Sequence, residues 1–366
     1  MKVLAINPGS TSTKIALFED DACLLSRNVA HDAAQLAAFD TISAQLPYRK
    51  QTIEALLAEE NADPSGLDAV VGRGGGLIAM EGGTYEIDAK LLEDARTGAN
   101  GVAHPAQLGS LLADEFAREA GARAFVVNPP DVDELQEVAR ITGIRGVYRT
   151  VHLHALNLKE TAIRHAATLG KSYGDCRFVV CHIGGGVSVS AHREGKMIDG
   201  FDIVGGEGPM APTRCGSVPV ADVVRYAEGR DLGEVLSLCH KTGGFVSLTG
   251  TSDAIELTER AAAGDEACRL AWDAMIYQIG KAIGSMAVVL EGQVDGILLG
   301  GGMAHSEDLV QRLRDTCAWI APVTAYPGEF EMEAMAAGAQ RVLSGAEEPK
   351  RYTGDPVWNP PTCWID

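Results

Sequence analysis

Short apolar runs that end in glycine-containing turns recur along the chain, and they predict β-strands. Residues 3–6 form the first of these runs, which ends in Asn-Pro-Gly, and residues 14–18 form the second. Proline and glycine favour tight turns between apolar runs. The pattern therefore predicts that residues 2–19 form a β-hairpin with a polar tip.

The same pattern returns about 175 residues later. Residues 177–183 are largely apolar, residues 184–186 are three glycines, and residues 187–191 suit a return strand. A repeated strand–turn–strand opening predicts two equivalent halves. We expect a duplicated α/β fold with a cleft between the copies.

Helical and strand patterns alternate through the rest of the chain. Residues 105–120 carry Leu108, Leu111, Leu112 and Phe116 on one helical stripe, which Pro105 opens. We place domain boundaries so that residues 1–149 plus 333–366 form one domain and residues 150–332 the other. Further helices are expected at 50–60, from His154, at 265–290 and at 331–343, and further strands at 68–71, 124–127, 294–299 and near 320–325. The tail at 352–366 is expected either to dock on the surface or to stay mobile.

Charge and cysteine usage narrow the class of protein. The 366 residues carry a formal charge of −19, which disfavours nucleic acid and anionic lipid as partners. An anionic substrate must then be held by a locally positive pocket. The eight cysteines form no CxxC pair, the N-terminus is not typical of a secretory signal, and no apolar run is long enough to cross a membrane. These features predict a cytoplasmic protein with reduced thiols and no membrane contact.

The first predicted turn is rich in groups that bind phosphate. Residues 7–14 provide an amide from Asn7, hydroxyls that include those of Ser10 and Ser12, and the ammonium of Lys14. Such a turn can hold phosphate oxygens and the water shell of magnesium. The Walker A spacing is absent, so this is not a P-loop. A polar hairpin tip without function is the alternative interpretation.

Two other glycine clusters and two arginines suit an anionic ligand. Gly184, Gly185 and Gly186, like Gly300, Gly301 and Gly302, follow predicted strands, where ligands bind in α/β sheets. Arg73 and Arg214 lie in glycine-rich loops and can pair with an anion. Plain flexible turns and surface salt bridges remain alternatives. His154 and His182 could equally be capping or core residues.

Seven segments, in this order, resemble butyrate kinases of the acetokinase family. They are residues 6–14, 71–75, 81–85, 154–157, 182–186, 206–209 and 326–329, and the resemblance extends from about residue 2 to residue 345. It implies two duplicated actin-like (ribonuclease H-like) domains with ATP or ADP and Mg²⁺ in the cleft between them. It also implies the reversible reaction butanoate + ATP = butanoyl phosphate + ADP, by direct in-line transfer. The partners would be a small carboxylate, its acyl phosphate and further copies of the chain in a homo-oligomer.

The resemblance also assigns roles to individual residues. Asn7 resembles a magnesium-shell residue, and Glu331, or as second choice Glu329, resembles a magnesium partner. Arg73 and Arg214 resemble the arginines that hold the substrate carboxyl and the transferring phosphoryl group, with His154 and His182 beside that group. Nucleotide contacts are implied for Ser10, Ser12, Lys14, His182, Gly184, Gly185, Gly186, Asp253, Gly300, Gly301 and Gly302. Acyl-chain contacts are implied for Arg73, Gly75, Val102, Leu153 and Pro209.

Two departures bear on activity and substrate. The family usually has a catalytic aspartate where this chain has Asn128. A carboxylate substrate is already ionised at neutral pH and needs no general base, so we expect a slower but active kinase. A catalytically impaired ATP- or acyl-phosphate-binding protein is the alternative. Gly75 replaces a valine of acetate kinases, which favours a four-carbon acid over acetate but leaves isobutyrate, valerate and propionate open.

Overall fold

The computed structural model describes residues 1–364, which form two compact units. Unit 1 comprises residues 1–133 and 330–359, and unit 2 comprises residues 134–329 together with the segment from Pro360. The units thus divide at 133/134 and 329/330, where the sequence suggested 149/150 and 332/333. Within the described residues, no helix is both long and apolar enough to span a membrane.

Unit 1 is built on a six-stranded sheet with the order β3-β2-β1-β4-β6-β5. The first three strands form an antiparallel meander, and β4 and β6 then add in parallel to β1. The edge strand β5 pairs antiparallel with β6. The strand bounds are β1 Lys2–Pro8, β2 Ser12–Glu19, β3 Ala22–Ala30, β4 Ala69–Gly72, β5 Thr84–Glu86 and β6 Arg123–Val127.

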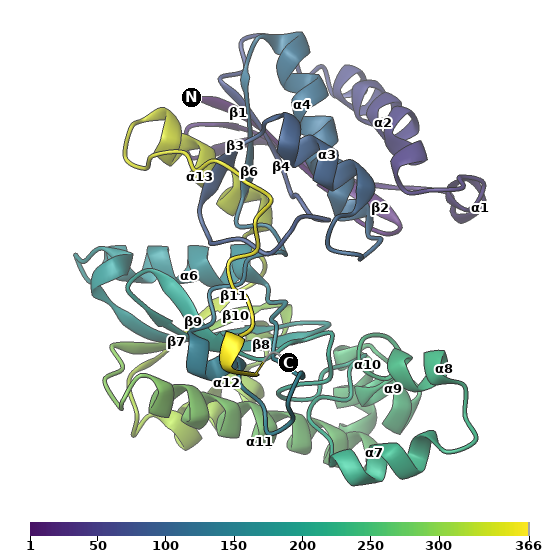
Figure 1. The fold of residues 1–366 in the computed structure, drawn as a ribbon, viewed down its shortest axis with the longest axis vertical. Coiled ribbons are helices and arrows are strands. Elements are labelled where there is room, and N and C mark those ends of the chain that lie inside the picture. The colour runs from purple at the N-terminus through teal and green to yellow at the C-terminus, as the bar shows by residue number, and fades with distance from the viewer. Residues whose placement is uncertain (365–366) are drawn as a thin grey trace. The chain divides into compact units, whose positions relative to one another are not determined.

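Helices cover both faces of this sheet (Figure 1). Leu108, Leu111 and Leu112 of α4 pack with Leu4 and Ile6 in one core. Because side chains alternate along a strand, the intervening residues of β1 face α13 on the other side. The helices of unit 1 are α1 Ala33–Ala37, η1 Ser43–Gln45, α2 Leu46–Glu59, α3 Ala89–Thr97, η2 Pro105–Gln107, α4 Leu108–Ala120 and α13 Glu331–Leu343.

Unit 2 repeats the topology of unit 1. Its five-stranded sheet has the order β11-β10-β7-β8-β9. β7, β8 and β9 form an antiparallel meander, while β10 is parallel to both β7 and β11. The strands are β7 Arg177–Ile183, β8 Val187–Arg193, β9 Lys196–Gly200, β10 Gly296–Gly301 and β11 Val323–Pro327. The equivalent strand orders confirm the predicted duplication of an α/β module.

The sheet of unit 2 is also covered on both faces. The long helix α11 packs on Val179, Cys181 and Ile183 of β7. Helix α6 lies on the opposite face, where His165 contacts Phe178 edge to face. The helices of unit 2 are α5 Glu137–Arg140, α6 Ala155–Thr168, η3 Tyr173–Asp175, α7 Val220–Ala227, α8 Leu232–Ser237, α9 Gly244–Thr249, α10 Ala254–Ala262, α11 Glu266–Val289, η4 Gly302–His305, α12 Glu307–Cys317 and η5 Thr362–Trp364.

The elements that the sequence predicts are present with shifted boundaries, but β3, β5, β9 and several helices, among them α3 and α12, were not predicted. Both hairpins and the helix at 331–343 are confirmed. The last strand of unit 2 begins three residues later than expected. The start of the tail docks on unit 1: the buried Tyr352 hydroxyl donates to Asp94 at 2.8 Å and accepts from the Ile78 N–H at 2.9 Å. Residues 365–366 of the predicted tail lie outside the described residues.

Helix α4 approaches β4 so closely that glycine is required on both elements. A Cβ atom at Gly72 would lie 2.1 Å from the carbonyl oxygen of Gly109, and one at Gly109 would lie 2.7 Å from the backbone nitrogen of Arg73. Real Cβ atoms do not approach backbone this closely, so helix and strand would have to separate. The contact fixes the backbone at Arg73.

Alanine at position 72 should therefore destabilise the protein. We expect Gly72→Ala to lower the free energy of unfolding by about 3 kcal/mol. As a control, Gly284→Ala in α11 adds a Cβ in open space within a helix and should stabilise by about 0.5–1 kcal/mol. Urea unfolding of both variants tests this, and equal stability of the two would contradict it.

Candidate functional site

The first hairpin turn is tight and leaves its tip exposed. Antiparallel pairing joins Pro8 to Thr13, and the Gly9 N–H donates to the Ser12 carbonyl at 2.7 Å. Ser10 is exposed, whereas Ser12 and Lys14 are partly buried. The turn therefore presents backbone and hydroxyl groups to a ligand, as a phosphate turn requires.

Three predicted residues of unit 1 meet at the end of β1. The Asn7 side chain donates from Nδ2 to Glu331 Oε2 at 2.8 Å. Arg73 Nε lies 3.8 Å from Glu331 Oε1. Glu331 is the first residue of α13, so the returning helix brings a carboxylate to the hairpin. Glu329, the second choice, belongs to unit 2.

This carboxylate–amide pair fits a magnesium ion that keeps most of its water. Mg²⁺ binds through one or two carboxylates plus phosphate oxygens and water, rather than in an all-protein cage. Glu331 retains free lone pairs beyond its bond to Asn7, whose Oδ1 is also a suitable oxygen donor. No group of three or more acidic, histidine or cysteine side chains within the described residues could hold a metal alone.

Asn128 has a structural role, because its side-chain amide and its backbone both hydrogen-bond Gly83. Its backbone has φ of +40°, in the left-handed region that asparagine tolerates better than most residues. Its side-chain Oδ1 accepts from the Gly83 N–H at 2.8 Å, and its own N–H donates to the Gly83 carbonyl at 3.0 Å. Arg73 Nη1 lies 3.4 Å from the Asn128 carbonyl. An oxygen acceptor, rather than a negative charge, is what this contact requires.

Two of the predicted acyl contacts of unit 1 do not form an obvious pocket. Gly75 has φ of +148°, and a Cβ there would lie 3.2 Å from the Cβ of Ala106. The missing side chain thus leaves no open space, because Ala106 already occupies that side. Val102 is 49% exposed on a loop.

One histidine beside Arg73 was missed in the sequence. His104 Nδ1 accepts from the Ala106 N–H at 3.1 Å, at the start of η2. Loss of hydration, together with the positive charges of Arg73 and Arg49, lowers its pKa. The neutral ring then carries its proton on Nε2 and can donate a hydrogen bond. The only signal was a histidine directly before the Pro-Ala-Gln helix start.

In unit 2, the two predicted histidines stack on each other. The rings of His154 and His182 lie 3.9 Å apart, with planes at 17°. Nδ1 of His154 bonds the Ser188 hydroxyl at 2.8 Å, and Nδ1 of His182 bonds the Asn157 Oδ1 at 3.0 Å. The oxygen of Asn157 only accepts, so Nδ1 of His182 carries a proton, and its Nε2 lies 3.7 Å from Glu329 Oε1.

The second glycine turn supports the guanidinium of Arg214. A Cβ at Gly186 would lie 1.5 Å from Arg214 Nη1, whereas one at Gly185 would meet nothing within 4 Å. Nε and Nη1 of Arg214 are buried and have no hydrogen-bond partner in the described part of the chain. Burial lowers the pKa of Arg214, and Asp202 opposes this only in part. Buried donors on an arginine without a bound carboxylate are typical of a site that receives an anion.

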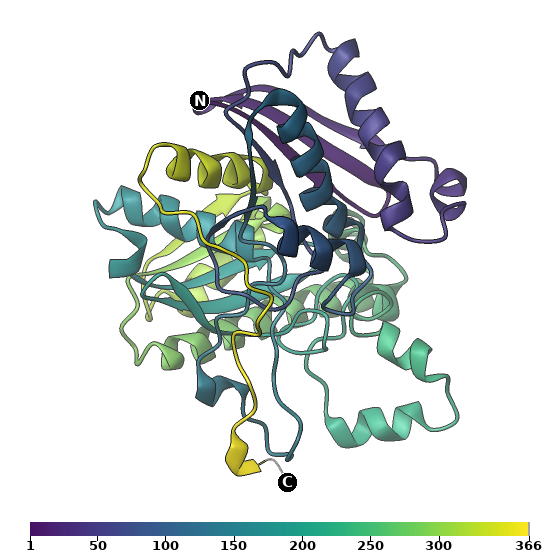
Figure 2. The ribbon, with the colours of Figure 1, turned by 45° about the horizontal axis from the view of Figure 1, so that its top comes forward.

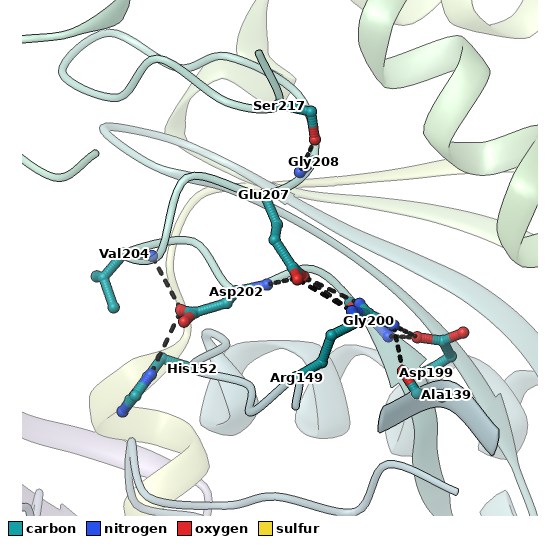
Figure 3. Close-up of polar contacts among 10 residues, drawn as sticks. All are labelled: Ala139, Arg149, His152, Asp199, Gly200, Asp202, Val204, Glu207, Gly208 and Ser217. Atoms are coloured by element: carbon teal, nitrogen blue, oxygen red, sulfur yellow. Dashed lines mark hydrogen bonds and ion pairs between the residues drawn. The ribbon is translucent and has the colours of Figure 1, made fainter. Parts of the chain in front are cut away.

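An ion-pair network holds residues 199–207, which precede Arg214 in the sequence (Figure 3). Arg149 reaches Glu207 at 3.0 Å and Asp199 at 3.1 Å, and it also bonds the Gly200 carbonyl. Glu207 accepts from the backbone N–H of Asp202 at 3.1 Å. Burial disfavours the charge on Arg149, but the two carboxylates outweigh it and raise its pKa. The residues from 199 to 207 are thus tied to the segment at Arg149.

The other predicted residues of unit 2 have evident structural contacts. The buried Leu153 packs against Gly200, and Pro209 is also buried. Gly301 has φ of +89° and would place a Cβ 2.4 Å from the Ile183 carbonyl oxygen; Gly300 lies beside it at the end of β10, and Gly302 begins η4. Asp253 caps α10 by accepting from the backbone of Ile255 at 2.8 Å.

Cys215, next to Arg214, is not activated as a nucleophile. Burial, followed by the neighbouring Cys239 thiol, raises its pKa to about 11. The thiol is therefore protonated at neutral pH and a poor nucleophile. In this segment, Arg214 rather than Cys215 is the candidate functional residue.

Solved structures of carboxylate kinases share this fold. Acetate kinase from Porphyromonas gingivalis has a TM-score of 0.75 at 20% identity, covering 93% of this chain and 99% of that one. Acetate kinase from Entamoeba histolytica has a TM-score of 0.71 at 16% identity, with coverage of 93% and 99%. The predicted fold class of two duplicated actin-like α/β domains is confirmed. The fold therefore places the protein in the two-domain actin-like class.

Sequence comparison narrows the class. A model of the acetokinase family matches residues 142–320. Butyrate kinase 2 from Clostridium acetobutylicum is 42% identical over 96% of this chain and 99% of its own length. A probable butyrate kinase from Enterococcus faecalis is 43% identical over 96% and 97%. The chain belongs to the acetokinase family, whose kinases use ATP and ADP.

The contacts of Asn128 lead to a prediction about stability. Asn128→Asp keeps an oxygen acceptor for the Gly83 N–H and should stay within about 1 kcal/mol of the natural protein. Asn128→Leu loses that acceptor and places a bulky residue at positive φ, so it should cost about 2 kcal/mol or more. Thermal or urea unfolding measures both, and a stable leucine variant would refute this account of the residue.

Proposed function

We propose that this protein transfers the γ-phosphoryl group of ATP to butanoate, giving butanoyl phosphate and ADP, and that it also catalyses the reverse reaction. A carboxylate oxygen bonds to the γ-phosphorus while the bond from that phosphorus to the bridging oxygen of ADP breaks. The relatives named butyrate kinase, at 42–43% identity over nearly the whole chain, support this choice of acid.

The observation that carries the proposal is the partly buried guanidinium of Arg214. Its Nε and Nη1 atoms are buried and find no acceptor among residues 1–364, and Gly186 leaves the space in which the guanidinium lies. A cation in this state is stabilised by an anion that arrives from outside. A transferring phosphoryl group, whose negative charge spreads over three oxygens, is such an anion.

The remaining chemistry needs positioning and charge stabilisation rather than proton removal. The carboxylate substrate has an unperturbed pKa near 4–5 and is ionised at neutral pH, so no general base is required. In the proposal, Arg73 holds the substrate carboxylate, while His154 and His182 lie beside the transferred group. Ser10, Ser12, Lys14 and the turn at 184–186 bind the phosphates, with Asp253 and the glycines at 300–302 near the nucleoside.

Magnesium is part of the proposal. Asn7 and Glu331 would hold it through oxygen atoms and its water shell, with Glu329 as the alternative carboxylate. When bound, the ion neutralises charge on the nucleotide phosphates. The hydrogen bond from Asn7 to Glu331 already orients both side chains.

The choice of a four-carbon acid as substrate is supported by the relatives rather than by Gly75. The space beside Gly75 is filled by Ala106, so an absent valine does not by itself enlarge a pocket. Gly75, Val102, Leu153 and Pro209 remain the proposed acyl contacts. The alternative is a kinase that carries out the same reaction on a branched-chain or other short-chain carboxylate, namely isobutyrate, valerate or propionate.

A hydroxamate assay across straight and branched acids of two to five carbons tests the substrate. We expect the highest kcat/KM for butanoate, with ATP and magnesium present. A maximum at another acid would replace the proposed substrate. Absence of product despite nucleotide binding in calorimetry would favour the catalytically impaired protein that the asparagine at position 128 suggested.

A matched pair of glycine variants tests the role assigned to Arg214. Gly186→Ala displaces the guanidinium, whereas Gly185→Ala adds a Cβ in open space on the same turn. Displacing a charge-stabilising group by about 1 Å typically costs about a hundredfold in rate. We expect that loss in kcat for Gly186→Ala and less than about threefold for Gly185→Ala. Equal rates would remove Arg214 from the mechanism.

The proposal includes a cytoplasmic location and a homo-oligomeric state. The eight unpaired cysteines support the first. The apolar residues Val220 and Val224 of α7, which are exposed within the single chain, support the second. Analytical ultracentrifugation that shows only monomer at micromolar concentration would contradict the oligomer.

A further inference from the structure

A fully buried arginine lies directly behind the first hairpin turn. Arg49, from α2, is 0% exposed. Helix α2 runs beside the first strands of unit 1 (Figure 2). Its guanidinium donates from Nη1 to the Ser12 carbonyl at 3.3 Å and to Thr13 Oγ1 at 3.0 Å, and from Nε to Gln45 Oε1 at 3.0 Å. One side chain thus joins the helix to the turn.

The positive charge of Arg49 has no counter-charge in the described part of the chain. All its acceptors are neutral, and Nη2 is buried without any partner. Burial accordingly lowers the pKa of Arg49. Most other buried cations in this protein pair with an acid, as Lys159 does with Glu134 at 2.7 Å. An unpaired buried charge is costly, so its retention calls for an explanation.

The groups around Arg49 confirm that its charge is not cancelled. Thr13 Oγ1 also bonds His31 Nε2 at 2.8 Å, and His31 Nδ1 bonds the Tyr48 hydroxyl at 3.2 Å. Burial and the charge of Arg49 lower the pKa of His31 to about 4. The histidine is therefore neutral at pH 7. The network carries one net positive charge.

We propose that Arg49 is a positioning residue of the first phosphate turn, which it holds through Ser12 and Thr13 while its unpaired charge stabilises a bound polyphosphate. The inference rests on the proposed function, which assigns phosphate binding to this turn. A charge beneath the turn acts through low-dielectric protein and is screened less than a surface lysine would be. The charge needs no direct contact with the ligand.

The field of Arg49 also extends toward Arg73. Burial is the main cause that lowers the pKa of His104, and the charges of Arg73 and then Arg49 lower it further. His104 and His31 belong to different segments of unit 1. In both, the charge of Arg49 adds to the effect of burial in lowering the pKa of the ring. Arg49 thus adds positive charge to this part of unit 1, although the whole chain is strongly acidic.

Three variants separate the charge from the packing. Arg49→Met removes the charge and the hydrogen bonds at similar volume, and Arg49→Lys keeps the charge. Gln45→Met removes the Nε acceptor and so loosens the support while the charge stays. Isothermal titration calorimetry measures the affinity of each folded variant for inorganic tripolyphosphate and for adenosine.

We expect Arg49→Met to weaken tripolyphosphate binding by about tenfold or more and to leave adenosine binding unchanged. Arg49→Lys and Gln45→Met should stay within about threefold of the natural protein for both ligands. An unchanged tripolyphosphate affinity in Arg49→Met overturns the inference, as does an equal loss in Gln45→Met. Failure of the natural protein to bind tripolyphosphate overturns it as well.

A measurement on the natural protein covers the case in which Arg49→Met does not fold. Tripolyphosphate on the turn would partly cancel the field of Arg49, so the pKa of His31, followed by NMR, should rise from about 4. No rise at saturating tripolyphosphate overturns the inference. Because neither readout uses an acid substrate, a protein without butanoate kinase activity could still satisfy both, which keeps this inference separable from the proposed reaction.

Discussion

Antiparallel pairing of the first two strands in each unit is the constraint on which the rest of the structure depends. In unit 1 the pairing of Pro8 with Thr13 leaves four residues for the turn, and three of them are polar. In unit 2 Ile183 pairs with Val187, so only three glycines remain. One turn can therefore offer hydroxyls, whereas the other offers bare backbone against which Arg214 lies.

Arginines in this protein fall into two energetic classes. Arg149 is surrounded by Glu207 and Asp199, so its charge is balanced and its role is to hold loops. Arg49 is buried against neutral groups, and Arg214 is partly buried and only partly compensated by Asp202. Within the described residues, each keeps at least one donor without a partner. A structural arginine would be more stable with an acid beside it. Arg49 lies beside the first hairpin turn and Arg214 beside the second, and at each turn an anionic ligand would supply charge that the protein provides only in part or not at all.

Much of the architecture could be predicted because it follows from local patterns of apolar and polar residues. Apolar runs that end in glycine predicted both hairpins, and the apolar stripe from Leu108 to Phe116 predicted α4. β3 was missed because, as an exposed edge strand with only Leu25 buried, it lacks an apolar run. The charge state of Arg49 and the contact of Asn128 with Gly83 depend on residues far apart in sequence. No spacing rule relates such pairs. The packing of Ala106 beside Gly75 likewise becomes visible only in the three-dimensional structure.

The return of α13 to unit 1 has a consequence for biosynthesis. Met335 and Ala339 of this helix are completely buried, and Tyr352 closes a neighbouring core. Unit 1 thus contains both the earliest and some of the latest residues to leave the ribosome. One apolar face of its sheet stays uncovered until α13 has been synthesised. During that time nearly two hundred intervening residues are made, and unit 2 becomes able to fold. Unit 1 is therefore completed only after residues 134–329 of unit 2 have been made.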